Sequence, residues 1–261
     1  MKRIIISAVL LLAGMQAAFA WGGKGHATVA ALAERHLTPE ARQAVTALLG
    51  CSIVDEASWM DKHRKDKEYA YTGSYHCMAM NHDGVYDTSW RMATGGDCVT
   101  GLTFAEYSLR NAEKLHLTDS AKVFHIRIMV HILGDMHCLC HAYVMPERNH
   151  WKCSFGGETF RYHAFIDYLP DRLFPEMEPS DIAAKLDNWK PSRIRKACKG
   201  TFEQWAQECC DRDQVIYEVN PYGTKVLDPD SVEKLRPAAE EAMQVAGYRL
   251  AMLLNKCFGN K

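Results

Sequence analysis

Beyond its first twenty residues the sequence lacks any apolar run approaching the roughly 20 residues that cross a bilayer as a helix. It also lacks an excess of positive charge, because 31 Lys and Arg stand against 32 Asp and Glu. No internal repeat, low-complexity tract or linker-like stretch divides the chain. These absences argue against a membrane-anchored protein, against a module that holds nucleic acid by charge neutralisation, and against several domains.

The first twenty residues have the composition of a secretory signal peptide. Lys2 and Arg3 form a basic start, residues 4–13 are an almost unbroken apolar run, and Ala18-Phe19-Ala20 supplies a small-x-small cleavage pattern. We therefore expect this segment to be removed, a mature chain that begins at Trp21, and a secreted or periplasmic location. The mature chain would carry 29 Lys and Arg against 32 Asp and Glu, so metal ions would have to supply positive charge toward any phosphate substrate.

All ten cysteines follow the expected cleavage site. In an oxidising compartment this predicts a partial disulfide framework, whose connectivity the sequence does not give. The adjacent Cys209 and Cys210 would pair with different partners or stay reduced. Because a domain of about 240 residues can bury a sufficient core by itself, disulfides would reinforce this fold rather than create it.

Helical periodicity dominates the mature chain. We expect a helix from Pro39 to Leu49 with Thr38 as its N-cap, and further helices at 26–37, around Trp59, at 104–115, 120–137, after Arg161, and at 180–188, 201–210 and 229–257. Residues 70–100 are rich in Gly, Asp and Asn and are interpreted as irregular, and a short hairpin fits between Ala142 and Gly157. Pro237 must lie in a first turn or at a kink. The pattern predicts one mostly α-helical domain over residues 21–261.

Histidine and aspartate recur at helical spacing. His131 and Asp135 are four residues apart, so both project from one face, and His163 and Asp167 repeat that arrangement. His141 follows just beyond the end of the first helix, and Asp61, His76 and His26 lie upstream. Imidazole and carboxylate donors suit a catalytic zinc site, in which one position is left to water. One such pair is more often a surface hydrogen bond, but two pairs flanking His141 favour metal binding. The remaining histidines are expected at the surface or behind the ligands: 36, 63, 82, 116, 125, 137 and 150.

Five segments occur in an order that points to a known family: Trp21-Gly-Gly-Lys-Gly-His26, Ala57–Arg64, Tyr75-His76, His131 to His141, and His163-Ala-Phe-Ile-Asp167. Together they resemble the zinc-dependent single-strand nuclease and 3′-nucleotidase family, relatives of bacterial zinc phospholipase C. The resemblance runs from Trp21 to about Asp167 and is followed by a compatible helical tail. It implies a mostly α, single-domain helical bundle of the phospholipase C/nuclease type with a short β-hairpin.

The resemblance also implies a site with three zinc ions. Asp61, His76, His131 and Asp135 would hold one ion, and His141, His163 and Asp167 a second. The third would be held by the α-amino nitrogen and carbonyl oxygen of Trp21, by His26 and by a shared Asp135. Because an internal amide nitrogen is a poor ligand, removal of the signal peptide would complete this site.

The activity implied by the resemblance is hydrolysis of single-stranded DNA or RNA, and of 3′-nucleotides, by attack of metal-activated water on phosphate. Asp61 would orient or deprotonate the water, and Arg64 would neutralise charge on the phosphoryl oxygens. Asn149 matches a position near the hairpin that contacts substrate. No membrane anchor and no obligate protein partner are expected.

The sequence departs from the family pattern at two places that keep alternatives open. Cys77 and Ala79 stand where the family carries a base-stacking aromatic and an Asp, which leaves open a zinc phosphodiesterase for phospholipid head groups. Between His137 and His141 the usual Gln-Pro-Leu reads Cys-Leu-Cys, which leaves open a disulfide or a thiolate that competes for zinc there.

Two local features favour the nuclease branch over the phospholipases. The gap from Trp21 to His26 is short, and the last ligand motif ends in Asp167 rather than Glu. A non-catalytic zinc-binding protein is the remaining alternative, and the retention of Asp61 and Arg64 argues against it.

Overall fold

The computed structural model describes residues 21–91, 95–142 and 151–259. The predicted signal peptide, residues 1–20, and the candidate substrate contact Asn149 lie outside the described residues. Among the described residues, no helix combines the length and the apolar character needed to cross a membrane.

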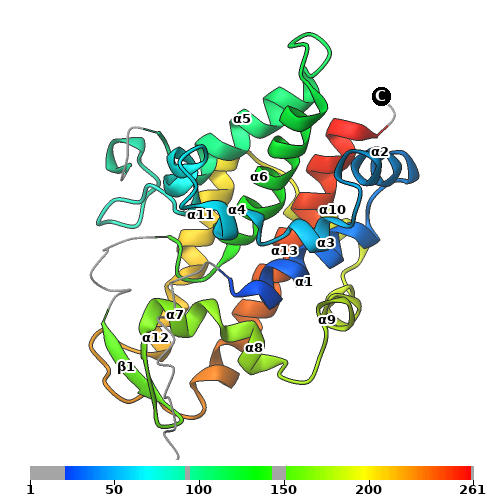
Figure 1. Cartoon of the computed structure of the whole chain (residues 1–261). Coiled ribbons are helices and arrows are strands. Elements are labelled where there is room, and N and C mark those ends of the chain that lie inside the picture. Colours follow the sequence, from blue (N-terminus) through cyan, green and yellow to red (C-terminus); the bar gives the residue numbers. More distant parts are fainter. Residues whose placement is uncertain (1–20, 92–94, 143–150, 260–261) are drawn as a thin grey trace, which may run out of the picture.

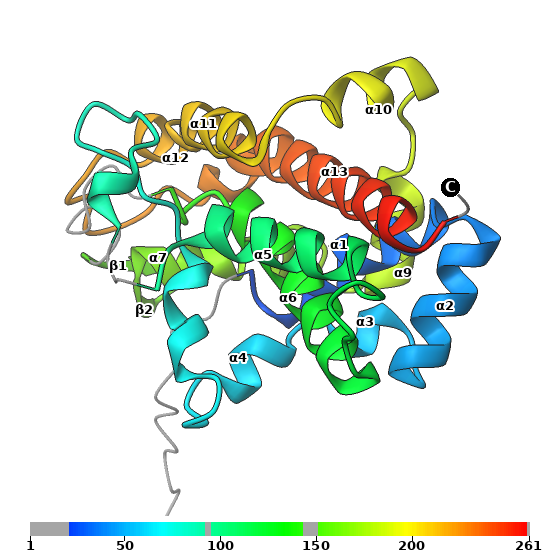
Figure 2. The ribbon, with the colours of Figure 1, turned by 90° about the horizontal axis from the view of Figure 1, so that it is seen from above.

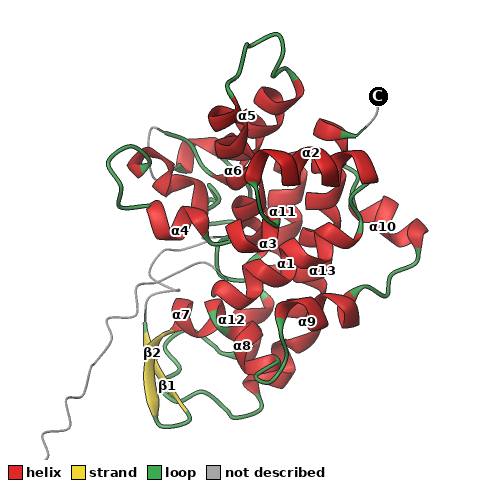
Figure 3. Ribbon diagram, turned by 45° about the vertical axis from the view of Figure 1, so that its right-hand side comes forward, coloured by secondary structure: helices red, strands yellow, loops and turns green. Residues whose placement is uncertain are grey.

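Helices make up most of the described chain, as Figure 3 shows. The longer ones are α1 (Gly23–Arg35), α2 (Pro39–Leu49), α5 (Cys98–Arg110), α6 (Asp119–His137), α11 (Phe202–Asp213) and α13 (Ser231–Phe258). The shorter ones are α3 (Ile53–Glu56), α4 (Trp59–His63), α7 (Tyr162–Asp167), α8 (Leu169–Leu173), α9 (Pro179–Leu186), α10 (Pro191–Ala197) and α12 (Val215–Val219), with 3-10 segments η1 (Ala70–His76) and η2 (Thr88–Trp90). The predicted mostly α-helical fold with a short hairpin is confirmed.

The long helix α13 runs through the middle of the molecule and packs against α1 and α6, and α6 in turn packs against α5 (Figures 1 and 2). Its buried side is mostly apolar and includes Leu235, Met243 and Leu250, all 0% exposed. Pro237 lies inside this helix, in its second turn rather than the first. The apolar core formed by these helices surrounds the polar residues of α6 described below.

Local side-chain chemistry explains where several helices begin. At α2, Thr38 Oγ1 accepts a hydrogen bond from the Ala41 amide at 3.2 Å and Pro39 occupies the first turn, as predicted. Helix α5 begins six residues before its predicted start. Asp97 caps this helix by accepting from the Thr100 amide at 3.0 Å, so α5 begins at Cys98 inside the segment that composition marked as irregular.

The hairpin lies further along the chain than its predicted position. Strands β1 (Lys152–Phe155) and β2 (Glu158–Arg161) pair antiparallel, with Lys152 opposite Arg161. Gly156 and Gly157 form the turn between them, with φ of 60° and 85°. Two successive positive φ angles suit the tight turn of a two-residue hairpin, so the glycines are its centre rather than its end. Figure 3 shows this hairpin at one edge of the molecule.

The expected disulfide framework is not formed. All ten cysteines lie in the described part of the chain and each remains a thiol. Several are distributed over separate elements as small buried side chains: Cys98 in α5, Cys153 in β1, and Cys209 and Cys210 in α11. Cysteine readily fills such apolar positions without pairing.

Candidate metal centre

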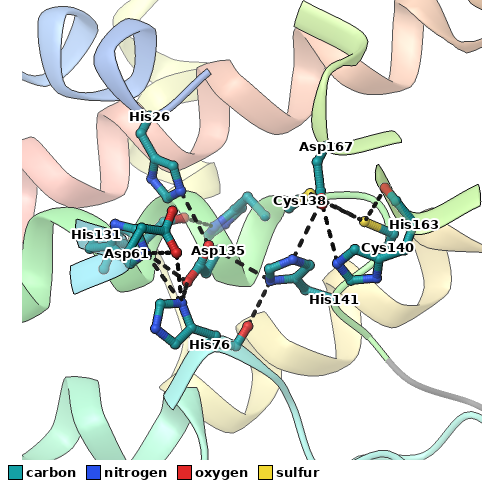
Figure 4. Close-up of polar contacts among 12 residues, drawn as sticks. His26, Asp61, His76, His131, Asp135, Cys138, Cys140, His141, His163 and Asp167 are labelled. Atoms are coloured by element: carbon teal, nitrogen blue, oxygen red, sulfur yellow. Dashed lines mark hydrogen bonds and ion pairs between the residues drawn. The ribbon is translucent and has the colours of Figure 1, made fainter. Parts of the chain in front are cut away.

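Eight histidine and aspartate side chains from distant parts of the sequence meet at one buried place. They come from α1, α4, η1, α6, the turn after α6, and α7: His26, Asp61, His76, His131, Asp135, His141, His163 and Asp167 (Figure 4). Helical spacing predicts that His131 and Asp135 share one helix face and that His163 and Asp167 share another. The structure brings both pairs together, with His131 Nε2 3.2 Å from Asp135 Oδ2 and His163 Nε2 3.4 Å from Asp167 Oδ2.

Asp135 lies at the centre of the larger group and is completely buried. His76 Nδ1 is 2.7 Å and His131 Nε2 3.2 Å from its Oδ2, whereas His26 Nε2 is 3.3 Å and His141 Nδ1 3.7 Å from its Oδ1. Burial alone would raise the pKa of Asp135, but the charges of His131 and His76 outweigh it and hold that pKa well below its usual range. One carboxylate therefore faces four imidazoles and stays ionised.

His131 and His26 are stacked, with ring centroids 4.1 Å apart, but they differ in basicity. Burial lowers the pKa of His131, yet the charge and hydrogen bond of Asp135 outweigh burial and raise it to about 9. For His26, burial and the charge of the neighbouring His131 outweigh the opposing effect of Asp135, so its pKa is lowered. A neutral His26 keeps a lone pair with which it can bind a metal ion.

Backbone carbonyls fix which ring nitrogen faces the site. His131 Nδ1 lies 2.7 Å from the carbonyl oxygen of Ala57, which directs Nε2 toward Asp135. His141 Nδ1 lies 2.6 Å from the carbonyl oxygen of His76, which directs Nε2 toward Asp167 at 3.7 Å. Metal-binding histidines commonly have the second ring nitrogen held in this way.

Asp61 completes the group from the side of α4. Its Oδ1 lies 3.9 Å from both His76 Nδ1 and His131 Nε2, too far for a hydrogen bond but suitable for two ligands of a shared ion. Donor atoms of His26, Asp61 and His131 all lie within 4.8 Å of one another, as do those of His76, His131 and Asp135.

Buried polar atoms that have no hydrogen-bond partner among the described residues are concentrated here. They include both ring nitrogens of His26, and Asp61 Oδ1, His76 Nε2, Asp135 Oδ1, His141 Nε2 and Asp167 Oδ2. Buried polar groups normally have partners, since leaving them unpaired is costly. Inward-facing nitrogen and oxygen donors of this kind fit divalent metal ions, which would satisfy them together.

Trp21 is anchored beside this group. Its side chain is 0% exposed, and the amide of the next residue, Gly22, donates to the carbonyl oxygen of Asp167 at 2.7 Å. Gly25 packs so closely that a Cβ there would lie 2.8 Å from Trp21 Cβ. The start of the expected mature chain is thus tied to α7, while metal binding by its α-amino group stays a prediction.

The remaining predicted positions follow the elements that carry these residues. Arg64 caps the C-terminus of α4, half-buried, directly after the turn that carries Asp61. Ala79 is buried and its amide donates to Asp97 Oδ2 at 3.3 Å, so its side chain offers nothing to a base. Cys77 is half-buried.

Three residues beside the predicted ligands are not assigned to the site by the sequence. Gly134 allows His26 to approach α6, because a Cβ there would lie 2.4 Å from His26 Nδ1. Asp213 of α11 is buried, and burial raises its pKa to about 8 even though Arg212 and His141 oppose the shift. His137 was expected near the surface or behind the ligands, and it is fully buried with Nε2 2.9 Å from Arg249 Nη1.

Comparison with known proteins gives matches along nearly the whole chain. The sequence model of a family described as S1/P1 Nuclease matches residues 21–259. Nuclease P1 of Penicillium citrinum is 25% identical over 272 residues, covering 92% of this chain and 99% of the relative. Endonuclease 5 of Arabidopsis thaliana is 26% identical over 306 residues, covering 100% and 98%, and Nuclease S1 of Aspergillus oryzae is 23% identical over 287 residues, covering 98% of each.

Proposed function

This chain belongs to the S1/P1 nuclease family, and we propose that it is a secreted, zinc-dependent enzyme that hydrolyses single-stranded DNA or RNA and accepts 3′-nucleotides. The observation that carries the proposal is the convergence of buried, unsatisfied imidazole and carboxylate atoms on Asp135 and Asp167. Such a set has little use without a metal ion, and relatives that span the same length are named as nucleases.

The proposed ligands are the nine positions identified from the sequence. Asp61, His76, His131 and Asp135 would hold one ion; His141, His163 and Asp167 a second; Trp21, His26 and a shared Asp135 the third. Zinc ions, when bound, lower the pKa of a water and offset negative charge on the phosphate and leaving group. The contacts of Asp135 to imidazoles on both of its oxygens support its assignment as the shared ligand.

The protein's own groups would orient and neutralise the reacting atoms. Asp61 would bind the ion through Oδ1, which has no hydrogen-bond partner among the described residues, and its other carboxylate oxygen would position the attacking water and accept its proton. Arg64 directly follows the same short helix, three residues after Asp61, and its guanidinium would offset charge on the phosphoryl oxygens.

The test is cleavage of single-stranded DNA and RNA by the purified protein before chelation, after chelation and after zinc is restored. We expect cleavage only with zinc. Arg64→Ala should reduce kcat by about 10²–10³-fold, the range for removing one group that stabilises transition-state charge. Lys62→Ala, an exposed cation on the same helix, is the matched control and should leave the rate unchanged.

A zinc-loaded protein that cleaves no single-stranded nucleic acid would overturn the substrate assignment. Phosphatidylcholine and other phospholipids would then be the next substrates, because Cys77 and Ala79 provide neither stacking nor hydrogen bonds for a base. Equal losses in Arg64→Ala and Lys62→Ala would reject the role given to Arg64.

A further inference from the structure

Two thiols point at the carboxylate of Asp167. Cys138 caps the C-terminus of α6 and Cys140 lies two residues beyond it, and both are buried. Cys140 Sγ is 3.1 Å and Cys138 Sγ 3.6 Å from Asp167 Oδ1, and the two sulfur atoms are 3.5 Å apart (Figure 4).

The turn after α6 brings these thiols and His141 to the same side. The Cys138 amide donates to the carbonyl oxygen of Asp135 at 3.0 Å, and the His141 amide donates to that of Cys138 at 3.1 Å. His141 Nε2, which has no hydrogen-bond partner among the described residues, lies 3.7 Å from the same Asp167 oxygen. Donor atoms of Cys138, Cys140, His141 and Asp167 all lie within 4.8 Å of one another.

These separations match a tetrahedral zinc site. With Zn–S of about 2.3 Å and Zn–N and Zn–O of about 2.1 Å, tetrahedral angles place two sulfur atoms about 3.8 Å apart, sulfur and oxygen about 3.6 Å, and nitrogen and oxygen about 3.4 Å. The observed distances of 3.5 Å between the sulfurs, 3.1 and 3.6 Å from sulfur to oxygen, and 3.7 Å from nitrogen to oxygen lie within about half an ångström of these values.

We propose that Cys138 and Cys140 bind, as thiolates, the metal ion that His141 and Asp167 hold, each thiol releasing its proton to solvent as the ion binds. This rests on the metal dependence in the proposed function and replaces the purely nitrogen and oxygen ligand set at that position. Four protein ligands close a zinc site, as in structural sites, so this ion would be retained firmly and would offer no position for water. His163 would then act as a positioning residue, holding the second Asp167 oxygen at 3.4 Å.

The proposed ions would then have different chemical roles. Two thiolates donate more negative charge than imidazoles, so an ion that they bind is a weaker electrophile. Activation of water would then belong to the region of Asp61, His131 and Asp135. Soft thiolate donors also bias this position toward zinc over magnesium or manganese.

The experiment is X-ray absorption at the zinc edge on the purified, zinc-loaded protein, together with the optical spectrum of its cobalt-substituted form. We expect a sulfur shell at about 2.3 Å and thiolate-to-cobalt charge-transfer bands in the near ultraviolet. The double variant Cys138→Ser/Cys140→Ser should lose both signals and bind less zinc. Cys153→Ser, which removes another buried thiol, is the matched control and should keep both signals.

The wild-type measurement decides the question even if a variant fails to fold. Zinc surrounded only by nitrogen and oxygen, or a disulfide between Cys138 and Cys140 found by mass spectrometry, would overturn the inference. A protein that cleaves single-stranded nucleic acid without a sulfur shell would overturn this inference alone. A sulfur shell in a protein that cleaves none would overturn the proposed substrate alone.

Discussion

The replacement Gly134→Ala tests whether the packing of His26 against α6 positions the site. Gly134 directly precedes Asp135, and a Cβ at this position would lie 2.4 Å from His26 Nδ1, closer than the 3.0 Å below which real Cβ contacts are essentially absent. The imidazole has no room to retreat, because it is 1% exposed and stacked on His131 with ring centroids 4.1 Å apart. Alanine should therefore displace His26 from Asp135.

Two opposing contributions set the magnitude. In the interior of a helix, alanine is more favourable than glycine by about 0.8–1.0 kcal/mol, so without the contact the change would stabilise the protein. Overpacking a buried site costs about 1–3 kcal/mol. We expect a net loss of up to about 2 kcal/mol, and since 1 kcal/mol shifts Tm by about 2–4 °C in a domain of this size, Tm should fall by a few degrees.

The assay combines thermal unfolding followed by circular dichroism with the zinc content per chain. Gly134→Ala should lower both, because a displaced His26 no longer presents its nitrogen to the ion. Gly73→Ala is the control, since no atom lies within 4 Å of a Cβ there, and it should lower neither. A higher Tm with unchanged zinc in Gly134→Ala would refute the packing argument.

Other perturbations separate effects on the metal site from effects on the fold. One extra residue before Trp21 should reduce zinc content and activity because an amide replaces the free amine, and equal zinc in both forms would contradict that role. Asp135→Ala should lower zinc content more than His163→Ala, since Asp135 faces four imidazoles, and the opposite order would show that Asp135 is not shared. Chelation should lower Tm because the buried donors lose their partner, whereas an unchanged Tm would mean that the protein satisfies them alone. Arg249→Met should cost about 1–3 kcal/mol in denaturant unfolding, because its guanidinium is buried and its loss leaves Nε2 of the fully buried His137 without this hydrogen-bond partner. Arg193→Met, an exposed pair with Glu241, should cost less than about 1 kcal/mol, and equal losses would contradict the importance of burial.

Helix positions could be predicted where local chemistry and periodicity agree. Thr38 and Pro39 mark the start of α2, and the structure has both in the predicted roles. The start of α5 was missed because its cap, Asp97, lies in a glycine- and aspartate-rich stretch where an acceptor side chain is as common in turns as at helix ends. The hairpin was placed too early for a similar reason, since Gly156-Gly157 can end a strand or turn between two strands.

The sequence predicts which residues form the site better than it predicts the hydrogen bonds and packing contacts that orient them. Spacing along a helix places His131 with Asp135, and order along the chain carries the resemblance to the family. The carbonyl oxygens of Ala57 and His76 that orient His131 and His141 have no sequence signature, because any residue presents a carbonyl. The approach of Cys138 and Cys140 to Asp167 depends on how α7 packs beside the turn after α6, which periodicity does not report.

Helix α6 supplies residues to both the candidate metal site and the hydrophobic core. Every residue of this helix from Ile128 to His137 is buried. His131 and Asp135 therefore lie in a buried segment together with the apolar residues Ile132, Leu133 and Met136. A helix buried on all sides normally carries apolar residues throughout, and ionised groups there are strongly destabilising unless they are paired. Asp135 faces four imidazoles, yet several of their nitrogens still have no hydrogen-bond partner among the described residues. The free energy of binding metal ions at these atoms would therefore also be free energy of folding, which ties the stability of α6 to the ions that the reaction requires.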